Sequence, residues 1–198
     1  MQTTLHPCAV PWSLSPTMSG VTLTHSESDT EPECQVAFGA GRLTNEGRTD
    51  MRLVQIRFTE CYFARTGHHS DDSSIADLPG YELSDAATPP DGADYLDWRH
   101  SKWRSDTVCP DSGFYVAEPS AWLRSLPESF QRDSAHYVID GRDGYVEVVA
   151  KAFEWTEWMW TTGHRDDVPS KETAVAQGTG NAQQGVGGQP ATPPRVRD

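Results

Sequence analysis

The first segment with a clear alternation of hydrophobic and polar residues is Met51–Arg65. Val54, Ile56 and Phe58 share one face at a period of two, while polar residues occupy the other face. This alternation is typical of a strand with one buried face. The pattern weakens at Thr59-Glu60, where we expect the strand to bend or to give way to a second one.

Two further alternating segments, Ala135–Asp140 and Tyr145–Trp155, predict the arms of a hairpin. The turn Gly141-Arg-Asp-Gly144 joins them, and its glycines would permit positive φ angles. In the second arm one predicted face carries Val146, Val148, Ala150 and Ala152, and the other carries Tyr145, Glu147, Val149, Lys151 and Phe153. Beyond Trp155 the pattern fits a helix or a strand.

Ser112–Glu118 is predicted as another strand, and Pro119–Leu126 as a short helix that ends at Pro127. The total is four to five strands with one short helix. We therefore predict an α+β fold with an antiparallel sheet, either a meander or a small open barrel. The absence of long helices argues against a helix bundle, and no strand–helix–strand series supports a doubly wound sheet.

The two ends of the chain lack such patterns. Residues 1–50 have scattered apolar residues interrupted by prolines, so we expect a weakly ordered N-terminal extension, with Met51 as an alternative start to Met1. The competing hypothesis is that Gln35–Phe38 forms an edge strand. Residues 163–198 contain no Leu, Ile, Met, Phe, Tyr or Trp and predict a disordered tail rich in Gly, Pro and Gln. The folded domain is expected over residues 51–162.

The net charge of the chain restricts the kinds of partner that it can bind. There are 16 Lys and Arg residues against 29 Asp and Glu, a net charge of -13. This charge argues against a nucleic-acid partner and against an anionic membrane surface. A basic protein partner is favoured, because opposite charges steer association. We therefore expect a non-catalytic binding protein of the immunity or antitoxin type.

Four cysteines, Cys8, Cys34, Cys61 and Cys109, are spaced unlike a zinc site or a redox motif. The chain begins without a recognisable secretory signal, so we expect a cytoplasmic protein with reduced thiols. A bridge between Cys61 and Cys109 is the alternative for an exported protein.

Three candidate binding residues, Trp98, Arg99 and Trp103, lie in the segment Asp97–Arg104. Tryptophan in such a polar context indicates an interaction surface, because indole and guanidinium groups often anchor interfaces. Packing within the core is the alternative for both indoles.

The hairpin carries the other candidates, His136, Tyr137 and Glu147. We expect Tyr137, or a neighbour if the register differs by one, to lie opposite Glu147. A carboxylate beside an imidazole or a phenol can support acid–base chemistry or line a tryptophan-rich pocket for a small ligand. The alternative is a cross-strand polar pair on an exposed face.

No metal or cofactor is expected. The segment His68-His69-Ser-Asp71-Asp72 offers four potential ligands but lacks a further histidine at the spacing of a known site. The sequence also lacks the glycine motifs of nucleotide-binding proteins and the serine motifs of hydrolases. Whether the protein is an enzyme stays open, and binding is favoured.

Several short runs resemble small, uncharacterised, single-domain proteins of actinobacteria. These runs are Cys109-Pro-Asp-Ser-Gly-Phe-Tyr-Val, Ser120-Ala-Trp-Leu, His136-Tyr-Val-Ile and Tyr145-Val-Glu-Val-Val-Ala150. The resemblance covers residues 53–155 and implies no particular activity, so it assigns no site residue. The excess of Arg over Lys, 13 against 3, fits a genome of high GC content.

Overall fold

The structure is a computed structural model that describes residues 2–15, 20–26, 33–68, 74–159 and 178–179. Apart from residues 178–179, the tail expected over residues 163–198 lies outside the described residues. So do His69, Asp71 and Asp72 of the candidate metal ligands.

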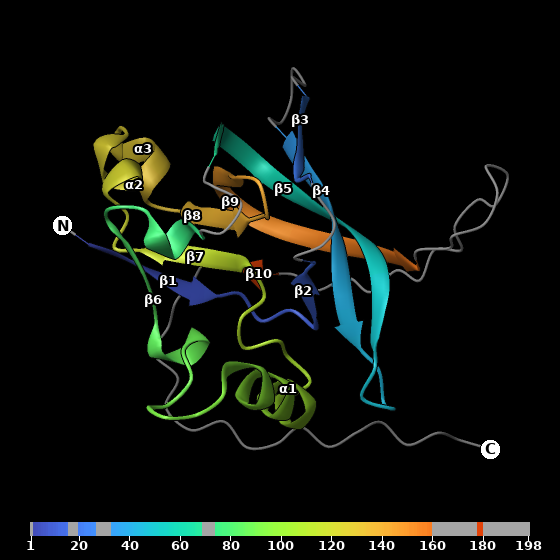
Figure 1. The fold of residues 1–198 in the computed structure, drawn as a ribbon. Coiled ribbons are helices and arrows are strands. Elements are labelled where there is room, and N and C mark those ends of the chain that lie inside the picture. The colour runs from blue at the N-terminus through green and yellow to red at the C-terminus, as the bar shows by residue number, and fades with distance from the viewer. Residues whose placement is uncertain (1, 16–19, 27–32, 69–73, 160–177, 180–198) are drawn as a thin grey trace, which may run out of the picture.

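Nine strands of the described chain form one mixed sheet that curls into a half-barrel (Figure 1). The order along the sheet is β2-β4-β5-β9-β8-β7-β1-β6, and β3 follows β2 along the same edge of β4. All the pairings are antiparallel except that of β1 with β6. The short β10 (Gly178–Thr179) adds to β9. The nine strands are β1 (Thr3–Pro7), β2 (Trp12–Leu14), β3 (Thr22–Ser26), β4 (Glu33–Leu43), β5 (Thr49–Gly67), β6 (Tyr81–Leu83), β7 (Phe114–Glu118), β8 (Ala135–Asp140) and β9 (Tyr145–Met159).

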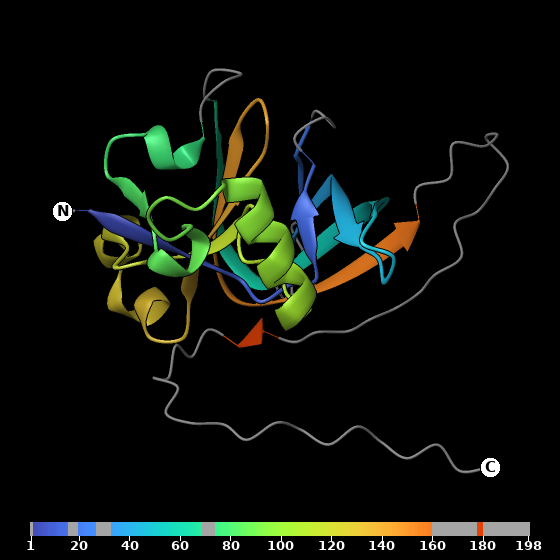
Figure 2. The ribbon, with the colours of Figure 1, turned by 60° about the horizontal axis from the view of Figure 1, so that its bottom comes forward.

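The helices are short and lie outside the curl. The helices α2 (Ala121–Ser125) and α3 (Glu128–Gln131) pack together and connect β7 to β8 along the chain. Helix α1 (Tyr95–Asp106) lies apart from them (Figures 1 and 2). Two 3₁₀ turns, η1 (Ile75–Asp77) and η2 (Asp85–Ala87), flank β6.

The amino-terminal segment joins the two ends of the curl. β1 pairs with β7 on one side, and β2 pairs with β4 on the other. Between them the Cys8 N–H donates to the Phe114 carbonyl at 2.8 Å, and the Leu14 N–H donates to the Ser112 carbonyl at 2.8 Å. A sheet that would otherwise have two distant edges is thereby drawn into a barrel-like shape.

Aromatic side chains fill the interior of the curl. Trp12, Phe58, Phe114 and Tyr137 are almost wholly buried, and their ring centroids lie 5.3–6.2 Å apart where they touch. Rings at such spacings gain stacking and edge-to-face contacts in addition to their burial. The interior is therefore a packed core.

Residues 1–50 belong to this sheet, which differs from the expected weakly ordered extension. Leu5, Trp12, Cys34 and Val36 from this region are fully buried. The segment Gln35–Phe38 lies within β4, which is bonded on both sides and is not an edge strand. Sequence periodicity missed these strands because prolines and short lengths obscure the alternation, whereas long-range pairing stabilises them.

The elements expected from alternation are confirmed at close to the predicted bounds: β5, β7, β8, β9 and the helix α2. The strand count was too low, and the stretch after Trp155 continues β9 as a strand to Met159. Helix α1 was missed because its apolar residues follow no helical period. Asp94 nevertheless caps it by accepting from the Asp97 N–H at 3.0 Å, and Thr107 ends it in the left-handed conformation.

The hairpin glycines have a role different from the expected one, since neither Gly141 nor Gly144 has a positive φ. Close approach requires them instead. A Cβ on Gly144 would lie 2.4 Å from the carbonyl oxygen of Gly67, and one on Gly141 would lie 2.5 Å from Val21. The turn therefore packs directly against the end of β5.

The cysteines also differ from expectation. A disulfide joins Cys34 on β4 to Cys61 on β5, with their Cα atoms 5.8 Å apart, while Cys8 and Cys109 are free and buried. Cys61 thus bonds to a neighbouring strand and not to Cys109. No helix in the described part of the chain is long and apolar enough to cross a membrane.

Candidate functional site

Two of the three candidates on α1 attach this helix to the sheet. Trp103 is 3% exposed, and its Nε1–H donates to the Pro11 carbonyl at 3.2 Å. The Arg99 guanidinium stacks on Trp103, 5.4 Å from the ring centroid, and donates to the Asp111 carbonyl at 3.1 Å and to the Ser13 hydroxyl. These side chains therefore hold α1 against the segments that contain Pro11, Ser13 and Asp111. For Trp103 this is the packing role that was the alternative to an interaction surface.

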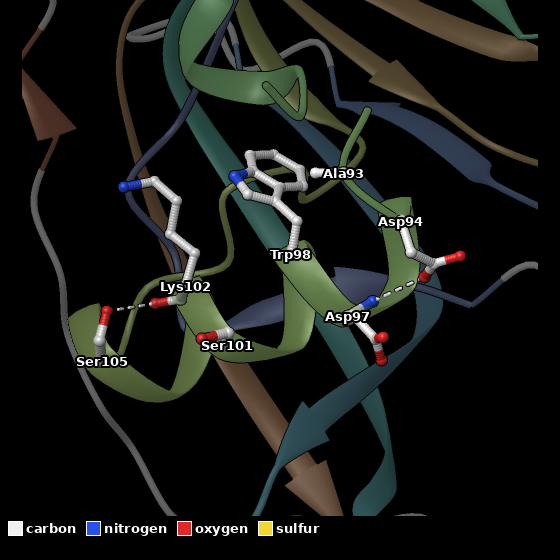
Figure 3. Close-up of a pocket in the computed structure, with 7 residues that line it drawn as sticks. All are labelled: Ala93, Asp94, Asp97, Trp98, Ser101, Lys102 and Ser105. Atoms are coloured by element: carbon white, nitrogen blue, oxygen red, sulfur yellow. Dashed lines mark hydrogen bonds between the residues drawn. The ribbon is translucent and has the colours of Figure 1, made fainter. Parts of the chain in front are cut away.

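The outer face of α1 carries the third candidate, Trp98. Figure 3 shows Trp98 rising from the helix between Lys102 on one side and Asp94 with Asp97 on the other. These residues line an open hollow of about 420 Å³. Trp98 is half-buried and lies 6.0 Å from the ring of Tyr95.

On the same helix, but outside the lining of this hollow, Leu96 is 57% exposed and Tyr95 is 39% exposed. They are two of the three large apolar side chains that are exposed in the described chain. The Trp98 indole, with Asp94 and Asp97 beside it, is suited to contact a partner that has both aliphatic and basic groups.

On the hairpin, the structure brings together His136 and Glu147 but separates Tyr137 from them. Glu147 pairs with Val138 across the strands, and His136 is its diagonal neighbour on the same face. His136 Nε2 lies 3.2 Å from Glu147 Oε1. Tyr137 points to the opposite face and belongs to the aromatic core. Its neighbour Val138 lies opposite Glu147, so the alternative register, shifted by one residue, is the one observed.

Glu147 is the centre of a buried polar cluster. Its side chain is 1% exposed. Arg65 on β5 donates a hydrogen bond to each carboxylate oxygen, with Nε 2.5 Å from Oε2 and Nη2 2.9 Å from Oε1. The Tyr81 hydroxyl of β6 donates to Oε1 as well. Three side chains from three other strands thus meet at the Glu147 carboxylate.

These contacts set the charge of Glu147. Burial by itself raises the pKa of this carboxyl, but the facing His136, Arg65 and Tyr81 outweigh burial and lower the pKa from 4.5 to about 2. Glu147 is therefore ionised at neutral pH in spite of its burial. Burial and the same carboxylate raise the pKa of Tyr81 well above its usual range.

The cluster extends from His136 to the start of α2. His136 Nδ1 lies 2.8 Å from the Ser120 hydroxyl, and the Trp122 ring stands edge-on to the imidazole at 5.0 Å. The Arg65 guanidinium lies over the Trp122 ring, 4.2 Å from its centroid. This arrangement ties α2 to the outer face of β8.

Ser120 contacts His136, which in turn contacts Glu147, as serine, histidine and carboxylate do in a hydrolase triad. Their surroundings nevertheless favour a structural role. The Ser120 hydroxyl accepts the Leu123 N–H at 2.9 Å as the cap of α2, and Ser120 is 5% exposed. The positive charge of Arg65 neutralises Glu147, so this carboxylate stabilises a protonated His136 less than a triad carboxylate would. The hollows beside α1, the β4–β5 hairpin and the β8–β9 turn are lined by other residues.

Sequence reasoning missed Arg65, Tyr81 and Ser120 in this cluster. Arg65 pairs with Glu147 across β5 and β9, a register that a bulge between Cys61 and Phe63 displaces. The opposite charges at Arg65 and Glu147 were the available signal, but the register could not be read from the sequence.

Among the described residues no group of three or more His, Cys, Asp or Glu side chains is arranged to hold a metal ion. No protein-family model, curated protein or solved structure matches the chain.

Proposed function

We propose that this protein is a non-catalytic binding protein that recognises a basic protein partner through the outer face of α1. The observation that carries the proposal is the half-buried Trp98 in an open hollow that Asp94 and Asp97 also line. The net charge of -13 supports a basic partner, because long-range attraction raises the rate of encounter.

The packing of α1 supports the same proposal. Arg99 and Trp103 anchor the helix to Asp111 and Pro11, and neither residue lines the hollow around Trp98. A preorganised face loses little conformational entropy when it binds. An aliphatic or guanidinium group of the partner would lie against Trp98, and its positive charges would face Asp94 and Asp97.

The test is capture from a lysate of the source organism by the full chain, with identification by mass spectrometry. We expect a basic protein that is retained at low salt and released at high salt. The double variant Asp94→Asn/Asp97→Asn and the single variant Trp98→Ala should each weaken retention at least tenfold.

The matched control removes two exposed carboxylates elsewhere, Glu128→Gln and Asp143→Asn. It changes the net charge by the same amount as the α1 double variant. Equal losses from both double variants would show a general charge effect and contradict a site on α1. Retention that does not depend on salt would contradict electrostatic recognition.

A further inference from the structure

A second cleft lies on the other side of α1, between the C-terminal half of this helix and the β4–β5 hairpin. Its volume is about 290 Å³. The charged side chains that line it are two arginines, Arg42 on β4 and Arg104 on α1, and Trp103, Thr44 and Asn45 lie between them. In a protein with 29 acidic residues, a cleft whose charged lining is entirely basic is unexpected.

Arg104 makes no ion pair or hydrogen bond within the described part of the chain. Its guanidinium lies against the hairpin turn, where a Cβ on Gly47 would come 2.7 Å from Nη2. Gly47 also has a φ of +77°, so the turn favours glycine for two reasons. The position of Arg104 in the last turn of α1 complements the helix dipole, but this leaves its N–H groups without an acceptor.

Arg42 connects the cleft to the end of the aromatic core. It forms an ion pair with Glu157, which is 2% exposed. The second oxygen of Glu157, and the indole N–H groups of Trp12 and Trp155, are buried without a partner among the described residues. Trp12 is the cross-strand neighbour of Arg42, and the Trp12 and Trp155 rings are 6.1 Å apart.

Arg104, which lines the cleft without an acceptor in the described chain, favours a bound anion that completes its hydrogen bonds. The charged groups that line the cleft, Arg42 and Arg104, offer only N–H donors. Arg42 already neutralises Glu157, so Arg104 leaves the cleft with a net positive charge.

We propose that this cleft binds a small oxyanion, a carboxylate or phosphate group, between Arg104 and Arg42. Guanidinium groups bind both kinds of anion through paired, charge-assisted hydrogen bonds. Thr44 and Asn45 supply further hydrogen bonds, and Trp103 supplies a face for an apolar part of the ligand. The volume is near the lower limit of ligand pockets and suits a phosphate or a short organic acid.

The experiment is titration of the full chain with inorganic phosphate, with succinate and with the neutral analogue succinamide, at constant ionic strength set by chloride. Indole N–H signals in ¹H–¹⁵N spectra report on binding. We expect saturable shifts of the Trp103 signal with phosphate, succinate or both, and none with succinamide. Saturation by phosphate identifies a phosphate-type ligand, and saturation by succinate identifies an organic acid.

Arg104→Ala should weaken the affinity by about 10-fold to 100-fold, the effect of one charge-assisted hydrogen-bonding group. Arg48→Ala is the matched control, because Arg48 is in the same hairpin, is 83% exposed and does not line the cleft. Equal losses in both variants, or shifts that do not saturate relative to chloride, would overturn the proposal. Variants of Arg42 are avoided because they would leave Glu157 buried and unpaired.

This proposal is independent of the outer face of α1. The Asp94→Asn/Asp97→Asn variant should bind the anion with unchanged affinity, so the failure of one proposal can be told from the failure of the other.

Discussion

Replacing Glu147 by Gln is the most informative test of the buried cluster. The substitution keeps the shape of the side chain and removes the charge that Arg65, Tyr81 and His136 surround. Removing one member of a buried ion pair destabilises proteins by about 3–5 kcal/mol. Arg65 is half exposed and can regain water, so we expect a loss near the lower value.

The pKa gives a second route to the same magnitude. A carboxyl whose pKa falls from 4.5 in the unfolded chain to about 2 in the folded protein contributes about 3 kcal/mol at neutral pH. Because the folded pKa is the lower one, this stability is present above pH 4.5 and is lost as the pH falls towards 2. About 2 kcal/mol of it should be lost by pH 3.

The assay is urea unfolding of the wild type and of Glu147→Gln at pH 7 and pH 3, followed by tryptophan fluorescence. The free-energy difference between them should be about 3 kcal/mol at pH 7 and about 1 kcal/mol at pH 3. Glu154→Gln is the matched control, since Glu154 is on the same strand and pairs with Arg57 at the surface. This control should cost at most about 1 kcal/mol.

Two results would refute the reasoning. A Glu147→Gln loss no larger than that of Glu154→Gln would mean that the buried network contributes no net stability. A loss that is the same at both pH values would mean that the ionised carboxylate is not its source.

Three further predictions concern the frame of the fold. Replacing Cys34 and Cys61 by serine should lower the free energy of unfolding by about 3–4 kcal/mol, the value for a loop of 27 residues, as measured in urea. Burial raises the pKa of the Cys8 thiol, so iodoacetamide at pH 8 should label Cys8 only after unfolding, as read by mass spectrometry. A chain that starts at Met51 lacks β1–β4 and should show no cooperative thermal unfolding by circular dichroism; a cooperative transition would contradict the place of residues 3–43 in the sheet.

The parts of the fold that sequence predicted are those that depend on local alternation. The strands β8 and β9 alternate over enough residues to define their faces, and their glycine turn marks the connection. The N-terminal strands depend on partners far along the chain, as Trp12 does on Arg42 in β4, and local pattern does not record such pairing.

The candidate sites show the same division. The proximity of His136 and Glu147 followed from their places on a hairpin. Whether Tyr137 shares a face with Glu147 depended on the register, because a shift of one residue moves a side chain to the other face of the sheet. On α1, composition singled out Trp98 and Trp103 together. Only the structure separates them, because Trp103 is buried against Pro11 and Trp98 lines the outer hollow.

Photo-crosslinking at position 98 tests the proposed function most directly. A benzophenone amino acid in place of Trp98, irradiated in cells of the source organism, should form an adduct with one basic protein. The same group at Phe130, a half-buried aromatic residue on α3, should form none with that protein. An adduct with a basic protein at position 98 alone is the predicted result. No adduct, or the same adduct at both positions, would contradict recognition through α1.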